Sequence, residues 1–435
     1  MNFRFFSGAQ KPVTLALIVA LNLVGSFALQ IIIIRNLGIG TDTDLYIAAQ
    51  TLPAVWTAII CACIQGVWLH RFSMFSENPS HNHTNYLNAV SQSTLIGVVS
   101  SLAFIATTHI WFDLLFPGLK DADSMVIFHI SALNWGAAAL SISFFPCLLM
   151  LRVRGIFVTS EFLLLAATAA SLLATYLVIG RWGLTGAATV FFCKALVVSV
   201  VYFLLGGIKA SETWSFRANV THGWRDFMNL LGGTALYKTM PIVDRFFGSL
   251  AASGSITSYN LATSGMGAAS ALLDRSTCAP IIAPFGKIVQ SGDYTKFRNA
   301  YRSSLVKLAA LIGLISITLI GAFDPLSDFL EILFKSPEGT GDQMMTLMLI
   351  LMGTLYSASS GTILVAAFYA MGDTRTPVVI GLLGFGLGIT LKINLFQIWG
   401  MHGLAAASSI YLSTNIFAFF IMLERKVDTR VKHAS

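Results

Sequence analysis

Charged residues are scarce in this sequence: Lys, Arg, Asp and Glu together make up 11% of its 435 residues. A soluble domain usually carries about 25%. The chain is instead 55% hydrophobic, with a mean hydropathy of +0.75. Apolar runs of about 18 or more residues recur along it, which is the pattern of membrane-spanning helices. The sequence therefore predicts an all-α polytopic membrane protein.

Cysteine is also sparse. The five cysteines lie in apolar segments without the spacing of a disulfide framework or a metal site, and we expect them to pack in the core: Cys61, Cys63, Cys147, Cys193 and Cys278. Loops are no longer than about 20 residues, too short for a soluble catalytic domain. The "HNH" at His81–His83 lies in a predicted polar connector without nearby carboxylates. We expect neither an enzyme nor a cofactor or metal site.

The hydrophobic pattern predicts about 12 transmembrane helices. The expected spans are 12–34, 45–68, 88–112, 125–151, 156–180, 184–208, 227–250, 255–283, 303–323, 343–370, 378–398 and 403–423. The first run follows Lys11 and has no small-residue cleavage site, which favours a retained helix over a signal peptide.

The distribution of basic residues predicts the orientation. With the N-terminus inside, eighteen basic residues fall in cytoplasmic segments and four in outer ones. This is a strong positive-inside bias, and it places both termini in the cytoplasm. The net charge of +7 is thereby explained by topology, and nucleic acid is not an expected partner.

Two short stretches repeat across the halves of the chain. "LGIGTDTDLYIAA" at 37–49 matches "LAASGSITSYNLA" at 250–262, and "WGLTGAA" at 182–188 matches "WGMHGLA" at 399–405. The two offsets nearly agree, which predicts two six-helix pseudo-symmetric lobes inserted the same way up. The expected organisation is an N-terminal lobe at 1–208, a cytoplasmic linker at 209–226 and a C-terminal lobe at 227–435. A substrate site between repeated halves is typical of transporters.

Five basic residues fall inside predicted spans, where a charge costs several kcal/mol: Lys194, Lys238, Arg245, Arg275 and Lys392. Lys392 lies near the outer end of its span, and we expect it to snorkel to the interface. Lys238 is nearly central in its span and has no acid within one helical turn, so it is the strongest candidate for substrate contact. Asp244 and Asp274 adjoin Arg245 and Arg275. For each pair the sequence leaves two interpretations open: the two charges neutralise each other structurally, or they take part in function. The net positive interior predicts an anionic substrate such as a phosphate or pyrophosphate headgroup.

Several of these stretches resemble the MurJ/MVF branch of the MOP flippase superfamily. "RNLGIGTDTDLYIAAQTLP" at 35–53 resembles its first-loop motif, and "VDRFFGSLAASGSITSYNLA" at 243–262 resembles the start of its second half. "FYAMGDTRTPVVI" at 368–380 and "GLAAASSIYLSTNIFAFFIMLERK" at 403–426 resemble its loop before span 11 and its span 12. Arg35 and Asp44 match the first of these motifs.

The resemblance implies a MOP flippase fold in a bacterial cytoplasmic (inner) membrane, with two lobes alternating access to a central cavity. It also implies flipping of an undecaprenyl-pyrophosphate-linked glycan to the outer leaflet. The implied cargo is lipid II or a surface-polysaccharide repeat unit, and the enzymes of polysaccharide or cell-wall synthesis are expected partners. The family usually has fourteen spans, and its cavity arginines correspond here to Leu23, Leu29, Thr57 and Thr263.

The expected substrate-binding residues are therefore Lys238, Arg245, Arg275, Lys194 and Arg35, and the candidates for ion coupling are Asp244, Asp274 and Asp44. Two alternatives within the same fold are an ion-coupled multidrug exporter and a non-transporting membrane scaffold. The exporter would need an acidic cavity for cationic drugs, and the interior here has the opposite sign. A membrane enzyme, such as a glycan polymerase or acyltransferase, would need a large outer loop or a buried His/Asp pair, and the sequence predicts neither.

Overall fold

The computed structural model describes residues 11–73, 79–206, 227–228, 230–232, 235–236, 238–282 and 284–434. Within these ranges the chain is almost entirely helical and contains no strand. Helices suit a chain this apolar because every backbone N–H and C=O must be paired within lipid. Eight helices among the described residues are long and apolar enough to cross a membrane. The all-α polytopic prediction is confirmed.

The chain divides into two compact units, Met1–Ile256 and Thr257–Ser435. The lobe boundaries expected from the sequence stay a prediction, and the predicted linker at 209–226 lies outside the described residues.

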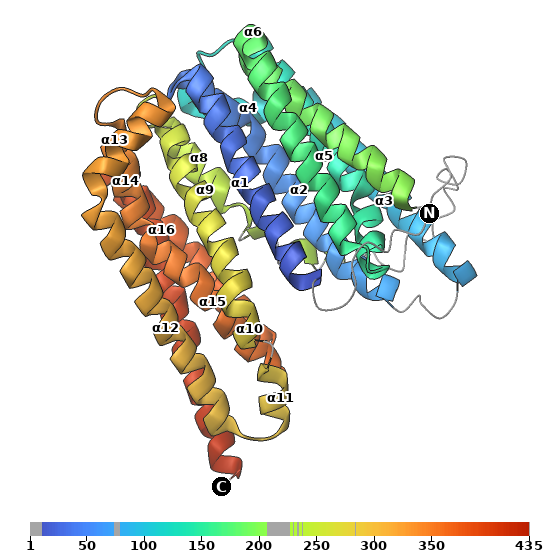
Figure 1. Cartoon of the computed structure of the whole chain (residues 1–435), viewed down its shortest axis with the longest axis vertical. Helices are drawn as coiled ribbons and strands as arrows, with labels where there is room; N and C mark the ends of the chain where they lie inside the picture. The colour runs from blue at the N-terminus through green and yellow to red at the C-terminus, as the bar shows by residue number, and fades with distance from the viewer. Residues whose placement is uncertain are drawn as a thin grey trace. The chain divides into compact units, whose positions relative to one another are not determined.

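The first unit is a bundle built around α5. Its helices are α1 (Lys11–Leu37), α2 (Thr41–Ser73), α3 (Pro79–Ala106), α4 (Thr108–Leu115), the short 3-10 helix η3 (Pro117–Leu119), α5 (Ser124–Val153), α6 (Phe157–Gly206) and α8 (Met240–Ser249). Helix α5 packs against α2, α3 and α6, while α1 packs against α6. These long helices run side by side (Figure 1).

The second unit has α15 in a similar central position. It comprises α9 (Ser255–Leu273, whose first two residues belong to the first unit), the π-helical turn η5 (Asp274–Cys278), α10 (Ala279–Ile282), α11 (Phe285–Gln290), α12 (Tyr294–Gly321), α13 (Phe323–Phe334), α14 (Thr340–Ile350), α15 (Met352–Ala370) and α16 (Arg375–Ala434). Helix α15 packs against α12 and α16. Hydroxyl pairs join α15 to α16, with Thr354 Oγ1 3.1 Å from Ser409 Oγ and Ser357 Oγ 3.1 Å from Ser413 Oγ. Such pairs act as polar contacts between helices in lipid.

Two glycines at repeat-related positions break the longest helices. Gly183 in α6 has φ 53° and ψ −133°, and Gly400 in α16 has φ 54° and ψ −131°. Each follows the Trp of a repeated WG pair, Trp182 or Trp399. Positive φ is readily available only to glycine. The matching angles confirm the repeat of the WG stretches. The two breaks divide α6 and α16 into two spans each.

Several predicted segment boundaries are wrong. The predicted polar connector that contains His81–His83 is helical from Pro79, so these residues lie in the first turns of α3. The third span is interrupted at Thr107, where α3 ends and the short α4 begins. A helix begins at Met240 with Pro241 in its first turn, a position that proline favours because its missing N–H needs no partner there.

Candidate substrate and coupling sites

A cavity inside the first unit contains Lys194. The cavity has a volume of about 330 Å³, and α2, α5 and α6 supply its lining, which includes Thr57, Cys61, Ser141, Lys194 and Tyr202. The Lys194 side chain is half-buried. It has no ion-pair or hydrogen-bond partner among the described residues. An ammonium in a largely apolar cavity is costly without a counter-charge, so the site favours an anionic ligand.

Lys238 lies close to the same region. It lies near Cys61, a residue of α2 that lines the Lys194 cavity. The Lys238 side chain is half-buried and has contacts of its own within the chain. The structure therefore brings two of the predicted cations, Lys194 and Lys238, toward the Cys61 side of α2.

A neighbouring cavity of about 300 Å³ extends this polar region. It shares Thr57, Cys61 and Ser141 with the first and adds Gln50 and Asn134. Asn134 is 1% exposed, and neither its amide nitrogen nor its carbonyl oxygen has a hydrogen-bond partner in the described part of the chain. A buried amide without partners is costly in an apolar interior. Sequence reasoning missed Asn134, although a lone Asn within the apolar stretch "ISALNWGAAAL" was a usable signal.

Arg245 has a local partner. Its Nη1 donates a hydrogen bond to the backbone carbonyl of Pro241 one turn earlier, at 3.1 Å. Arg245 and the adjacent Asp244 are both half-buried on α8. This geometry supports a structural contribution of Arg245 beside its predicted role in substrate binding.

Asp44 is buried where the first loop meets the turn before α9. Its Oδ2 accepts a hydrogen bond from the backbone N–H of Gly254 at 2.7 Å, and its side chain is 2% exposed. Nearby, the hydroxyls of Thr41 and Ser253 lie 2.9 Å apart. These residues belong to the two stretches that the repeat makes equivalent. Arg35, in the last turn of α1, is exposed.

Asp274 and Arg275 lie in η5, a π-helical turn that the sequence did not predict. Single π turns within helices occur frequently at functional sites. The half-buried Asp274 lies beside Cys278 and Thr362. The side chain of Arg275 lies outside what the structure describes.

The prediction that Lys392 snorkels is wrong. Lys392 is 1% exposed, and its Nζ lies 5.8 Å from the centroid of the Tyr411 ring. Both residues belong to α16, on opposite sides of the break at Gly400. The reversal of direction at this break lets the second half of the helix cover Lys392, so the lysine interacts with an aromatic face.

The repeated helix breaks and the apolar spans are those of a polytopic membrane protein, and its first unit contains a polar cavity. The family model described as "Lipid II flippase MurJ" matches residues 33–434. The chain therefore belongs to the lipid II flippase MurJ family, a family of multi-pass bacterial inner-membrane flippases for lipid-linked glycans and not a family of enzymes.

Solved structures agree on the fold. The chain is similar to a lipid II flippase MurJ in an inward closed conformation, with TM-score 0.81 and 11% identity, covering 95% of this chain and 87% of that one. It is also similar to an inward-facing multidrug resistance MATE family transporter of the MOP superfamily, with TM-score 0.75, 12% identity and coverage of 97% and 100%. A MOP superfamily transporter from Pyrococcus furiosus, described as having a binding pocket of reverse polarity, gives TM-score 0.65 and 11% identity over 96% of both chains. No curated protein sequence matches.

Proposed function

We propose that this protein flips an undecaprenyl-pyrophosphate-linked glycan to the outer leaflet by alternating access, with both termini in the cytoplasm. The moving bodies are the lobes at 1–208 and 227–435. The cargo is lipid II or a surface-polysaccharide repeat unit. The observation that carries the site assignment is Lys194, a half-buried cation that lines a cavity and has no ion-pair partner among the described residues.

The resemblance gives this lysine a specific role. Thr57 occupies a position at which the family is expected to have a cavity arginine, and Thr57 and Lys194 line the same cavity. A cation on α6 thus stands near the place where the family carries one on α2. Together with Lys238, Lys194 would offer two ammonium groups to a pyrophosphate, which binds Lys and Arg donors through several oxygens.

The cavity composition disfavours a cationic drug as the cargo. Among the described residues, neither cavity lining contains Asp or Glu. The acids that could couple transport to an ion, Asp44, Asp244 and Asp274, lie elsewhere. Likeness to a MATE transporter is a likeness of fold at 12% identity.

The direct test is a flipping assay with the full chain reconstituted in vesicles containing a fluorescent polyprenyl-pyrophosphate-linked glycan. We expect Lys194→Gln to slow flipping at least about tenfold, since it removes one charge-assisted contact, and Lys194→Arg to retain most of it. Lys120→Gln, which changes an exposed loop lysine, is the matched control. Full flipping by a Lys194→Gln, Lys238→Gln double variant would refute this site.

The cargo can be identified in cells. Depletion of the protein should cause accumulation of one lipid-linked intermediate, measured by mass spectrometry of extracted lipids. Accumulated lipid II would indicate peptidoglycan synthesis, and a different lipid-linked oligosaccharide would indicate a surface polysaccharide. An unchanged lipid profile, together with tolerance of Lys194→Gln and Lys238→Gln, would favour a non-transporting scaffold.

A further inference from the structure

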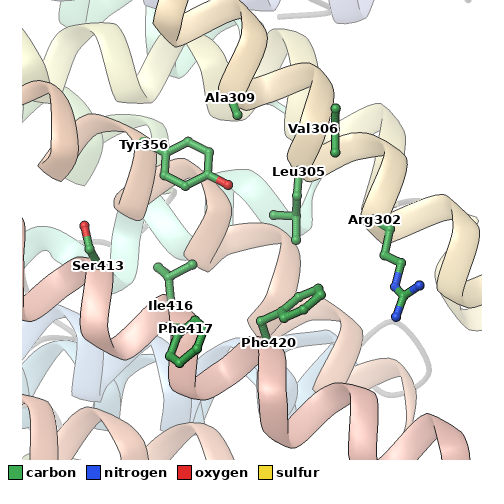
Figure 2. A pocket seen from close by; sticks show the side chains of 9 residues that line it. All are labelled: Arg302, Leu305, Val306, Ala309, Tyr356, Ser413, Ile416, Phe417 and Phe420. Carbon is green, nitrogen blue, oxygen red and sulfur yellow. The ribbon is translucent and has the colours of Figure 1, made fainter.

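The second unit carries an apolar groove that is distinct from the cavities described above. It lies between α12, α15 and the second half of α16 and has a volume of about 540 Å³. Its lining is aliphatic and aromatic over most of its length and is formed by Leu305, Val306, Ala309, Tyr356, Ser413, Ile416, Phe417 and Phe420, with Arg302 as the one charged member. Figure 2 shows Arg302 at one end of the groove and Ser413 at the other.

Arg302 is only partly used by its ion pair. Its Nε and Nη2 donate to Oε1 and Oε2 of Glu424, both at 2.7 Å. A guanidinium has five N–H donors, and the Arg302 side chain remains 49% exposed. The N–H groups of Nη1 can therefore donate to a second anionic group.

The rim of the groove is apolar and accessible. Val306 and Phe417 are 69% and 66% exposed, and both lie in helices apolar enough to span a membrane. Such side chains face lipid in a bilayer, where the medium available to fill a groove is a hydrocarbon chain. An apolar groove that ends beside the remaining N–H donors of Arg302 matches an amphiphile with an anionic headgroup.

The charge around Arg302 is net positive, which is the sign that attracts an anionic headgroup. The segments 293–307, 373–375 and 424–432 contain nine basic and four acidic residues, a net charge of +5. Ion pairs hold these segments together: Arg298 pairs with Asp428, Arg302 with Glu424 and Lys426 with Asp373. Clusters of Lys and Arg at the end of spanning helices attract anionic lipids.

We propose that this groove binds an anionic phospholipid of the bilayer, with one acyl chain between Leu305 and Phe417 and the phosphate on the Nη1 edge of Arg302. A phosphodiester carries one negative charge, which suits one half-used guanidinium. A pyrophosphate would call for more donors than the groove supplies. The proposal is independent of the transport function proposed above.

Native mass spectrometry of the full chain in detergent tests the proposal. The protein is stripped of lipid and titrated with phosphatidylglycerol or phosphatidylcholine of the same acyl composition. We expect tighter binding of phosphatidylglycerol. Ala309→Phe should fill the groove and abolish this binding, whereas Leu314→Phe, an exposed position on the same helix outside the lining, should leave it unchanged.

Two further variants separate the headgroup from the chain. Arg302→Gln should reduce the preference for phosphatidylglycerol by about tenfold, the scale of one charge-assisted contact. Glu424→Gln should increase the preference, because it releases the guanidinium from its carboxylate. A purely structural role for the Arg302–Glu424 pair would not produce opposite effects.

Photo-crosslinking tests the proposal on the unsubstituted chain, so its result does not depend on whether a variant folds. Phosphatidylglycerol with a diazirine in its acyl chain should label Phe417 or Phe420. Equal binding of the two phospholipids, labelling confined to other helices, or stronger retention of undecaprenyl pyrophosphate than of phosphatidylglycerol would overturn the proposal.

Discussion

The carboxylate of Asp44 accepts a hydrogen bond from the backbone N–H of Gly254 at 2.7 Å, although the two residues lie 210 positions apart. Asp44 is in the first turn of α2, and Gly254 directly precedes α9. Gly254 has φ +86°, so the turn needs a residue that tolerates this angle. A buried carboxylate thus satisfies one of the free N–H groups at the beginning of a helix.

We expect Asp44→Ala to destabilise this junction by about 1–3 kcal/mol, because a buried N–H loses its acceptor. Hydrogen exchange in detergent should show faster exchange of the Gly254 amide, with a lower unfolding temperature. Thr41→Val is the matched control, because it removes an exposed hydroxyl pair with Ser253 and should have little effect. Unchanged exchange at Gly254 in Asp44→Ala would contradict the role assigned to the carboxylate.

The cavity shared by Thr57 and Lys194 allows a charge-relocation experiment. If the cavity needs a cation and not a particular residue, Thr57→Arg should restore flipping to Lys194→Gln, since both side chains line the same space. We expect the double variant to flip clearly faster than Lys194→Gln alone, because the new guanidinium offers similar donors from another wall. The rate of glycan-lipid flipping in vesicles measures it.

Thr57→Gln in the same Lys194→Gln background is the size control and should give no recovery. Equal rates for the Arg and Gln variants would mean that the positive charge at this site does not drive transport. A rescue seen only with Arg would assign the charge, and not the lysine side chain, as the functional element.

Much of the fold could be predicted because its determinants are local in the sequence. Long apolar runs specify spanning helices, and the repeated WG pairs mark the two positions where glycine adopts the same angles. The candidate site was harder to predict. Lys194 was recognisable as a buried charge, but the groups that share its cavity come from α2 and α5.

The features that the sequence analysis predicted wrongly or missed also depend on packing between distant segments and on backbone geometry. Lys392 was expected at the interface on the basis of its distance from the end of the span, yet the helix that follows Gly400 covers it with Tyr411. The π turn at Asp274 and the hydrogen bond from Arg245 to Pro241 depend on backbone geometry that hydropathy does not encode. Long-range packing determines where a charged side chain lies, whereas hydropathy shows only that a charge within an apolar segment is unusual.

The glycines at the two helix breaks give a prediction about stability. Gly183→Ala and Gly400→Ala should each destabilise the protein by about 1–3 kcal/mol, because an L-residue is strained at φ near +54° with ψ near −131°. Gly180 is a suitable control, since a Cβ added there meets open space and its φ is not positive. Thermal unfolding in detergent measures the difference, and similar melting temperatures for the Gly183 and Gly180 variants would contradict it.

The ion pair between Asp373 and Lys426 predicts a pH-dependent contribution to the stability of the second unit. Burial disfavours the charged carboxylate, but hydrogen bonds from Lys426 and Thr376 outweigh this and hold the pKa of Asp373 well below its usual range. Because the folded pKa is depressed, the contribution is fully present above the unfolded pKa of about 4 and is lost as the pH falls toward the folded pKa.

We expect Lys426→Gln to lower stability by up to about 1 kcal/mol near neutral pH, a small value because the Lys426 side chain is 37% exposed and screened by solvent. The difference in unfolding temperature between the two proteins should stay constant from about pH 7 to 5 and shrink below about pH 4. Lys432→Gln, a change of an exposed residue near the end of the same helix, controls for the loss of a positive charge. A Lys426→Gln difference that grows on acidification would reverse the sign of the linkage and exclude Asp373 as its source.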